Sequence, residues 1–476
     1  MGQEIKHVRF SRQDFAAFQE RLRAETELLA AWFAEGRFDA GPAVGGFELE
    51  AWLVDHHCRP LPINERFIQA LGSPMVVPEL ARFNVEMNSL PHTLRGDVLR
   101  RTEAELDATW RRCEAVAGEL DARLVMIGIL PTVREEELNL ANMSRMKRFR
   151  ALNAQVLRLR HGHPLEVDIH GADDLHTLHG DVMLEAAATS FQIHLQVPPA
   201  EAARFYNAAL VLSAPMVAAT ANSPHLFGKR LWDETRIPLF EQATALDEVE
   251  TDAAHSLNRT SFGTGYVQSL LDCFRENLEH HPVLLPILAE QAPEALAHLR
   301  LHNGTIWRWN RPIVGFDAAG RPHLRIEHRV VPAGPGVTDA VANMALFFGL
   351  VHALARQAPA PEERLPFEQA RANFYAAAEQ GLAAELVWLD GRRRPVRRLL
   401  LDELLPLART GLESLALEAA DIDRYLGIIA ARVERGRTGA AWQRAWVAQH
   451  GADMQALTAA YVARQRSAAP VHEWEL

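Results

Sequence analysis

GGFELEAWLVD, residues 45–55, alternates like a β-strand but carries two glutamates inside an apolar run. Successive side chains of a strand point to opposite faces, so Phe47 and Leu49 share one face while Glu48 and Glu50 share the other. The strand rise separates these two carboxylates by about 6.6 Å. That spacing is too wide for both to hold one ion comfortably, but it suits two neighbouring ions with one carboxylate each.

Three later stretches show the same combination of one apolar face and one chemically active face. They are FNVEMNSL (83–90), TSFQIHLQV (189–197) and RPHLRIEHRVV (321–331). Their polar faces carry Glu86, His194, and the set Arg325, Glu327 and Arg329, respectively. If the four strands form one sheet, the apolar faces would pack on helices and the polar faces would gather these groups together.

Several carboxylates brought together repel one another, and burial strengthens the repulsion. Divalent cations resolve that conflict, and carboxylate oxygens with one imidazole suit Mg²⁺ or Mn²⁺ better than Zn²⁺. The alternative is that the polar face is simply solvated, as the outer faces of antiparallel sheets often are. The pattern alone leaves both interpretations open.

The rest of the chain predicts an α+β protein. Apolar periodicity predicts helices over about 12–35, 95–121 and 142–160, and an almost wholly helical chain from about residue 338. The segment HGHPLEVDIHGADDLHTLHGD (161–181) is interpreted as a solvated or partner-facing loop, with a lid over the active site as the minor alternative.

Composition excludes several classes of protein. A formal charge of −11 argues against nucleic acid as a partner. No Gly-x-Gly-x-x-Gly or P-loop motif is present, and no run of about 18 apolar residues suggests a membrane span. The N-terminus has no apolar signal region, and three scattered cysteines suit reduced thiols, so a cytoplasmic protein is expected.

The ordered set of motifs resembles the glutamate–cysteine ligase family, whose members share the catalytic fold of glutamine synthetase. The resemblance rests on Gly-Phe-Glu-Leu-Glu (46–50), PELARFNVEMNSLP (78–91), TSFQIHLQV and HLRIEHRVV. SLNRTSFGTGY (256–266) and HNGTIWRWNRP (302–312) resemble further family segments. The resemblance covers roughly residues 45–350 and implies a curved antiparallel sheet with flanking helices.

The resemblance also implies a role for each polar residue. Glu48, His194 and Glu327 would hold one metal ion near the ATP phosphates, and Glu50, Glu86 and Glu79 a second ion near the attacking carboxylate. Arg329 and Arg259 would neutralise the transferred phosphoryl group, and Arg308 or Arg311 would bind the carboxylate of the acidic substrate. The cofactor would be Mg²⁺ or Mn²⁺, with ATP as co-substrate.

The implied activity is an ATP-dependent carboxylate–amine ligase that works through an acyl phosphate. Its partners would be small molecules, an amino acid such as glutamate and an amine such as cysteine, with neither nucleic acid nor a membrane involved. A catalytic domain is expected over 1–355 and a helical region, packed on the same domain, over 356–476. The alternatives are a non-catalytic or regulatory protein that retains the ligase fold and, more weakly, a metal-dependent hydrolase. The amine and the oligomeric state stay open, and a homo-oligomer is compatible with the sequence.

Overall fold

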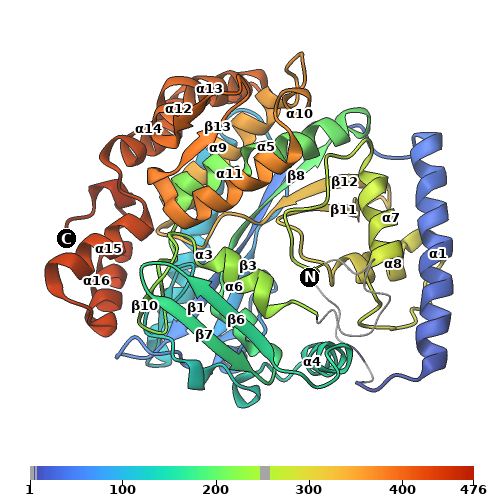
Figure 1. The fold of residues 1–476 in the computed structure, drawn as a ribbon, viewed down its shortest axis with the longest axis horizontal. Coiled ribbons are helices and arrows are strands. Elements are labelled where there is room, and N and C mark those ends of the chain that lie inside the picture. Colours follow the sequence, from blue (N-terminus) through green and yellow to red (C-terminus); the bar gives the residue numbers. More distant parts are fainter. Residues whose placement is uncertain (1–4, 6–7, 247–257) are drawn as a thin grey trace.

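All four alternating stretches belong to one antiparallel sheet. The computed structural model describes residues 5, 8–246 and 258–476. The strands run in the spatial order β11 (Asn310–Phe316), β12 (Pro322–His328), β8 (Phe191–Val197), β1 (Val44–Val54), β3 (Asn84–Asn88) and β2 (Val76–Pro78). Two short strands, β4 (His92–Thr93) and β5 (Arg123–Val125), pair with the ends of β1. The α+β class and the curved antiparallel sheet are therefore confirmed (Figure 1).

The register of the sheet places the predicted polar residues side by side. His194 of β8 lies opposite Gly46 of β1 and opposite Glu327 of β12. Glu50 of β1 lies opposite Glu86 of β3. Because directly paired residues point to the same face, these carboxylates and the imidazole share one surface of the sheet.

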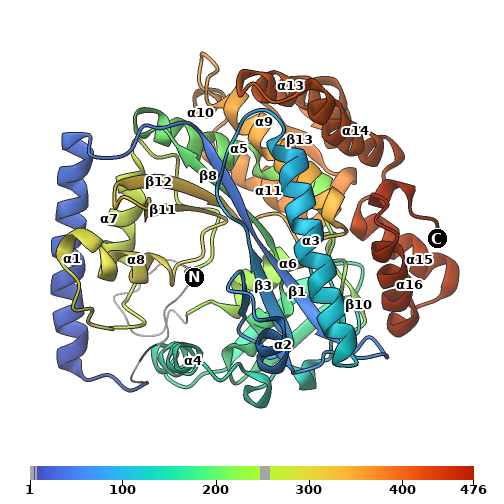
Figure 2. The same ribbon diagram turned by 180° about the vertical axis from the view of Figure 1, so that it is seen from behind.

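The apolar face of the sheet packs on helices. Phe47, Phe191 and Ile326 belong to the same buried cluster as residues of α3 (Val98–Glu119), α5 (Ala202–Thr220) and α9 (Val337–Leu354). Figure 2, the view from behind, shows α3 on the near side of the sheet, alongside β1. The polar face is buried as well: Glu86 is 0% exposed and Glu327 1%. The interpretation of a solvated polar face is therefore wrong.

Two helices are long and apolar enough to cross a membrane, although the sequence suggested none. They are Pro199–Thr220 and Val337–Leu354, whose most apolar windows are 89% and 83% buried inside the protein. Both windows pack into the core beneath the sheet, and this burial accounts for their apolar composition.

The helical C-terminal region is joined to the sheet domain by close backbone packing and buried polar contacts. At the crossing of α13 (Leu405–Ser414) and α9, a Cβ on Gly411 would lie 1.9 Å from the Gly349 carbonyl, so no side chain fits there. A buried ion pair of 2.7 Å joins Arg432 to Asp339. The division of the chain near residue 355 stays a prediction.

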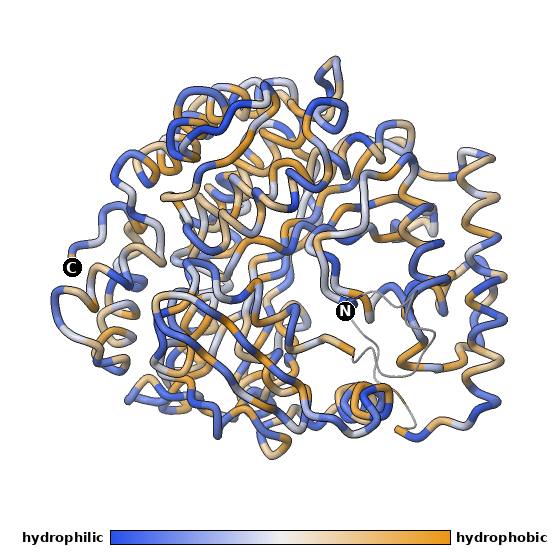
Figure 3. The backbone as a smooth tube through the Cα atoms, in the orientation of Figure 1, coloured by the Kyte–Doolittle hydropathy of each residue, from blue (hydrophilic) through white to orange (hydrophobic). Residues whose placement is uncertain are grey.

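The helices predicted over 12–35, 95–121 and 142–160 are confirmed to within about five residues at each end, whereas α2 (Asn64–Leu71) and α6 (Arg236–Ala243) were not predicted. The predicted helix over 12–35 is α1 (Arg12–Glu35), whose outer position at one edge of the molecule matches its alternating hydropathy (Figure 3). The remaining helices of eight or more residues are α2 (Asn64–Leu71), α4 (Lys147–Leu159), α6 (Arg236–Ala243), α7 (Leu270–His280), α11 (Phe367–Gln380), α14 (Ala419–Arg435), α15 (Gly439–His450) and α16 (Met454–Arg466), and the shorter ones are α8 (Ala297–Asn303), α10 (Pro361–Arg364) and α12 (Val396–Leu399).

The histidine-rich segment is not a loop. It forms a hairpin of β6 (Leu165–His170) and β7 (Asp174–His179), in which every second residue is buried. Leu165, Val167 and Ile169 supply the apolar face, a period-2 pattern that the many polar residues of the segment obscured. Two smaller two-stranded sheets, β9 (His225–Leu226) with β10 (Lys229–Arg230) and β13 (Glu385–Val387) with β14 (Arg393–Pro395), complete the fold.

Candidate active site

The centre of the polar face is a triad of Glu48, His194 and Glu327, contributed by three adjacent strands. His194 Nε2 lies 3.4 Å from Glu48 Oε1 and 3.7 Å from Glu327 Oε1. One ligand atom from each residue lies within 4.8 Å of the other two. Among the described residues, this is the only group of three potential metal ligands that converges so closely. The sequence predicted these three residues as the ligands of one ion.

The triad leaves polar atoms without hydrogen bonds although it is buried. Glu48 Oε2 and both ring nitrogens of His194 have no hydrogen-bond partner among the described residues. Buried polar atoms are rarely left unsatisfied, because each costs about 1–3 kcal/mol. A divalent cation bound by two carboxylates and an imidazole would satisfy them, so the residues present fit a metal ion.

The electrostatics of the triad favour cation binding. Burial, followed by the charge of Glu327, raises the pKa of Glu48 to about 7. Burial, followed by the charge of Arg325, lowers the pKa of His194 to about 3, so the imidazole is neutral and can act as a ligand. Burial alone would raise the pKa of Glu327, but Arg311 and Arg329 beside it bring the pKa below its ordinary range.

The second predicted ligand set is a looser group of Glu50, Glu79 and Glu86. Burial and the charge of Glu79 raise the pKa of Glu50 to about 7. Burial and the charge of Glu48 raise the pKa of Glu86 well above its ordinary value. Glu50 also accepts hydrogen bonds from the Ser190 amide at 2.6 Å and from Gln192 Nε2 at 3.0 Å. These carboxylates interact electrostatically, but their ligand atoms do not converge as those of the triad do.

Two of the four predicted arginines reach the site. Arg329 donates to Glu327 Oε2 at 3.1 Å and to Gln192. Arg311 makes a bidentate bridge to Glu327, with Nε 2.7 Å from Oε2 and Nη2 2.9 Å from Oε1. Arg311 therefore uses its planar fork on a protein carboxylate, and its role as a clamp for the acidic substrate stays a prediction that requires this bridge to open.

The structure does not bring Arg259 and Arg308 to the site. Arg259 is fully buried and donates to the carbonyl groups of Thr305, at 2.9 Å, and Pro282. Arg308 donates to Asn277 Oδ1 at 2.6 Å and to Glu276. Each guanidinium is engaged by local acceptors, and neither lines the cavities described below.

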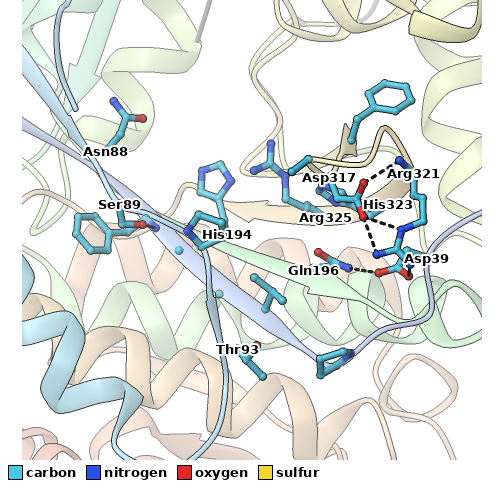
Figure 4. A pocket seen from close by; sticks show the side chains of 18 of the residues that line it. Asp39, Asn88, Ser89, Thr93, His194, Gln196, Asp317, Arg321, His323 and Arg325 are labelled. Atoms are coloured by element: carbon cyan, nitrogen blue, oxygen red, sulfur yellow. Dashed lines mark hydrogen bonds and ion pairs between the residues drawn. The ribbon is translucent and has the colours of Figure 1, made fainter. Parts of the chain in front are cut away.

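Two cavities meet at the triad. A cavity of about 660 Å³ is lined by residues that include Glu50, Glu79, Arg311 and Arg329. A second cavity of about 510 Å³ lies on the other side and is lined by residues that include Gln196, Asp39 and Arg321 (Figure 4). Glu48, His194 and Arg325 line both cavities. The triad therefore stands where the contents of the two cavities could meet.

Sequence reasoning missed four charged residues that line the larger cavity, Arg148, Glu185, Arg236 and Arg300. Arg236 is buried, donates to Glu234 at 3.0 Å and reaches the carbonyl oxygen of Val330 at 2.6 Å, which braces the chain that follows Arg329. Glu185 lies in the 3₁₀ segment η3 (Val182–Ala187), within the apolar run VMLEAAA. A lone acid in an apolar run just before the histidine strand is the signal that could have revealed it.

Comparison with known proteins identifies relatives of this arrangement. The family model described as glutamate–cysteine ligase family 2 matches residues 44–460. A search of curated protein sequences found no significant match.

Two solved structures have the same fold at low sequence identity. The glutamate–cysteine ligase of Francisella tularensis, in complex with AMP, is 12% identical with a TM-score of 0.54, and the match covers 90% of each chain. The bifunctional glutathione synthetase of Pasteurella multocida is 10% identical with a TM-score of 0.51, and the match covers 95% of this chain and 55% of that one. The family match spans the sheet, the triad and most of the C-terminal helices, and the chain accordingly belongs to glutamate–cysteine ligase family 2 and is a carboxylate–amine ligase.

Proposed function

We propose that the protein joins a carboxylate to an amine at the expense of ATP, through an acyl phosphate. The observation that carries this proposal is the buried triad of Glu48, His194 and Glu327, with its unsatisfied ligand atoms, at the meeting point of two cavities. A carboxylate oxygen of the acid would attack the γ-phosphorus of ATP and release ADP. The amine would then attack the acyl carbon and release phosphate.

The two cavities suit different reactants. The 510 Å³ cavity, with Phe47, Phe316 and Arg325 in its lining, would hold the nucleotide with its phosphates toward the triad. The 660 Å³ cavity would hold the acid and the amine, because Glu50, Glu79 and Arg329 open only to that side. The acid would be an amino acid such as glutamate.

The described residues divide the work of phosphoryl transfer. Glu48, His194 and Glu327 would hold one Mg²⁺ or Mn²⁺ ion, and Glu50, Glu79 and Glu86 a second, looser one. Such cations neutralise charge on the phosphates and on the acid. Arg329, held by Glu327 and Gln192, presents a fixed positive charge to the transferred phosphoryl group.

The test is a product assay with purified protein, ATP, Mg²⁺, a panel of acidic amino acids and hydroxylamine as a general amine. The proposal expects hydroxamate, ADP and phosphate in equal amounts, each dependent on the acid. AMP and pyrophosphate would instead indicate an acyl adenylate and contradict the acyl phosphate. Turnover without ATP would favour a hydrolase.

A further inference from the structure

Among the carboxylates of the larger cavity that lie outside the triad, Glu185 differs from the others because it has no partner. Glu185 lines the cavity from η3, and no hydrogen bond or ion pair joins its carboxylate to another of the described residues. Glu48 and Glu327 belong to the triad assigned to a metal ion. Glu50 is engaged by Ser190 and Gln192, and Glu79 accepts from the Leu80 amide at 3.2 Å. Glu185 is thus the acid most available to a ligand.

The wall around Glu185 is mostly apolar. Ala186 follows it in the lining, and Phe149 and Leu152 of α4 line the same cavity, together with Arg148 of that helix. A hydrogen bond of 3.1 Å from the Val182 amide to Asn153 Oδ1 joins η3 to α4. The side chains of these two segments therefore lie at the same end of the larger cavity. A carboxylate set in an apolar wall is costly to ionise unless a cation faces it.

The electrostatics agree with a missing cation. Burial, followed by the charge of Glu79, raises the pKa of Glu185 to about 8, while Arg329 opposes the shift. These interactions also place Glu185 within electrostatic reach of Glu50, on the side where the acid would bind. A positive group bound beside Glu185 would restore its ionised form.

Building on the proposed ligase function, we propose that Glu185 binds the ammonium group of the amine substrate and takes one proton from it. The carboxylate would become a carboxylic acid, and the ammonium a neutral amine whose lone pair attacks the acyl carbon. The C–N bond forms as the C–O bond to phosphate breaks. Phosphate carries away the bonding electrons and takes the surplus proton of the new amide nitrogen, leaving as hydrogen phosphate. The apolar wall selects a primary alkyl amine with an apolar body.

Hydroxylamine separates this step from the rest of the reaction, because it is mostly uncharged at neutral pH and needs no deprotonation. In Glu185→Gln, kcat/KM for primary alkyl amines, tested with n-butylamine and cysteine, should fall by about 10²-fold or more, the usual contribution of a general base. Hydroxamate formation from hydroxylamine should change by less than about 3-fold, because general-base assistance is not required there. Glu185→Asp should recover part of the loss with the alkyl amines.

Glu241 offers a matched control. It is a partly buried acid whose pKa burial raises to about 7, but it is satisfied by Trp309 Nε1 at 2.7 Å and lies outside the cavity lining. Glu241→Gln should affect the alkyl amines and hydroxylamine alike. Mn²⁺ affinity should be the same in Glu185→Gln as in the wild type, because Glu185 is not assigned to a metal.

The outcomes separate the two proposals. A wild-type protein that forms no hydroxamate refutes the ligase proposal itself. A Glu185→Gln variant that loses alkyl amines and hydroxylamine equally, loses neither, or loses Mn²⁺ affinity refutes the role of Glu185 alone. A wild type that uses hydroxylamine but no primary alkyl amine also refutes it, because Glu185 would then have no ammonium group to bind.

Discussion

Two regions of the molecule set histidine beside carboxylates across neighbouring strands, and only one has the features of a reaction centre. In the hairpin, His170 lies 2.9 Å from Asp174 and His176 lies 3.0 Å from Glu166. In the central sheet, His194 lies 3.4 Å from Glu48. The exposed fraction of the side chain is 74% for His170 and 8% for His194. Residue type and strand pairing are shared, so burial makes the difference.

Burial reverses the effect of the same neighbours. The hydrogen bond to Asp174 raises the pKa of exposed His170, whereas burial lowers the pKa of His194 to about 3 despite its adjacent carboxylates. The His–Asp and His–Glu pairs of the hairpin are exposed to solvent, so their hydrogen bonds add little to the stability of the fold. In the triad, Glu48 Oε2 and both ring nitrogens of His194 lack hydrogen bonds that would compensate their burial, and a bound metal ion would provide that compensation.

The largest contrast should come from removing one charge in each region. Glu48→Gln removes a triad ligand and should lower ligase activity by about 10²–10³-fold, the scale on which loss of one transition-state-stabilising group acts. Glu166→Gln removes the matching acid of the hairpin and should leave activity unchanged. ADP release and Mn²⁺ titration of both variants measure the contrast. Equal activity in the two variants would contradict the metal assignment.

The next largest effect concerns the buried bridge between Arg311 and Glu327. Arg311→Met leaves Glu327 without its bidentate partner and should destabilise the metal-free protein by about 3–5 kcal/mol, as breaking a buried pair does. Added Mn²⁺ should recover much of this loss, because a bound cation replaces the missing charge. Urea unfolding with and without Mn²⁺ measures both quantities. Arg311→Lys, which keeps the charge, is the control, and an unchanged stability of Arg311→Met would refute the importance of the bridge.

Alternation along single strands predicted the sheet and its shared polar face, and the resemblance to the glutamate–cysteine ligase family grouped three of the polar residues as one metal triad. Period 2 put Glu48, His194 and Glu327 on polar faces, and burial of the opposite faces fixed the register that brings them together. The arginines were harder to predict. Arg259 lies outside the strands, where no periodicity states which way a side chain points, and local carbonyl groups engage it.

The hairpin and the role of Glu185 were not predicted from the sequence. The hairpin pattern was hidden because polar Thr177 and His179 lie on its buried face and Leu178 on its exposed face. A role for Glu185 could not be assigned from the sequence, because its surroundings include α4, which lies earlier in the chain and packs against η3 only in the folded protein. The hairpin was therefore missed because its local pattern is irregular, and Glu185 because long-range packing is not encoded in single-strand periodicity.

A smaller effect should appear in the pH dependence of the metal-free protein. The folded-state pKa values of Glu48 and Glu50, about 7, lie above the ordinary value of 4.5, so their ionisation opposes folding. The stability present below the ordinary pKa is lost as pH rises through about 7, by about 1 kcal/mol for each group between pH 6.5 and 8. Thermal unfolding should show a falling Tm over this window, and saturating Mg²⁺ should flatten the curve. A Tm that rises with pH without metal would contradict the repulsion.

The smallest effect should come from His170→Gln, which tests the hairpin as the solvated counterpart of the triad. Because both partners of His170 are exposed, the substitution should leave Tm, ligase activity and Mn²⁺ affinity unchanged. NMR of the imidazole protons sharpens the contrast: His170 should titrate above the ordinary imidazole range, and His194 should not titrate between pH 5 and 8. A loss of Mn²⁺ affinity in His170→Gln would place a metal on the hairpin and remove the distinction that burial draws between the two regions.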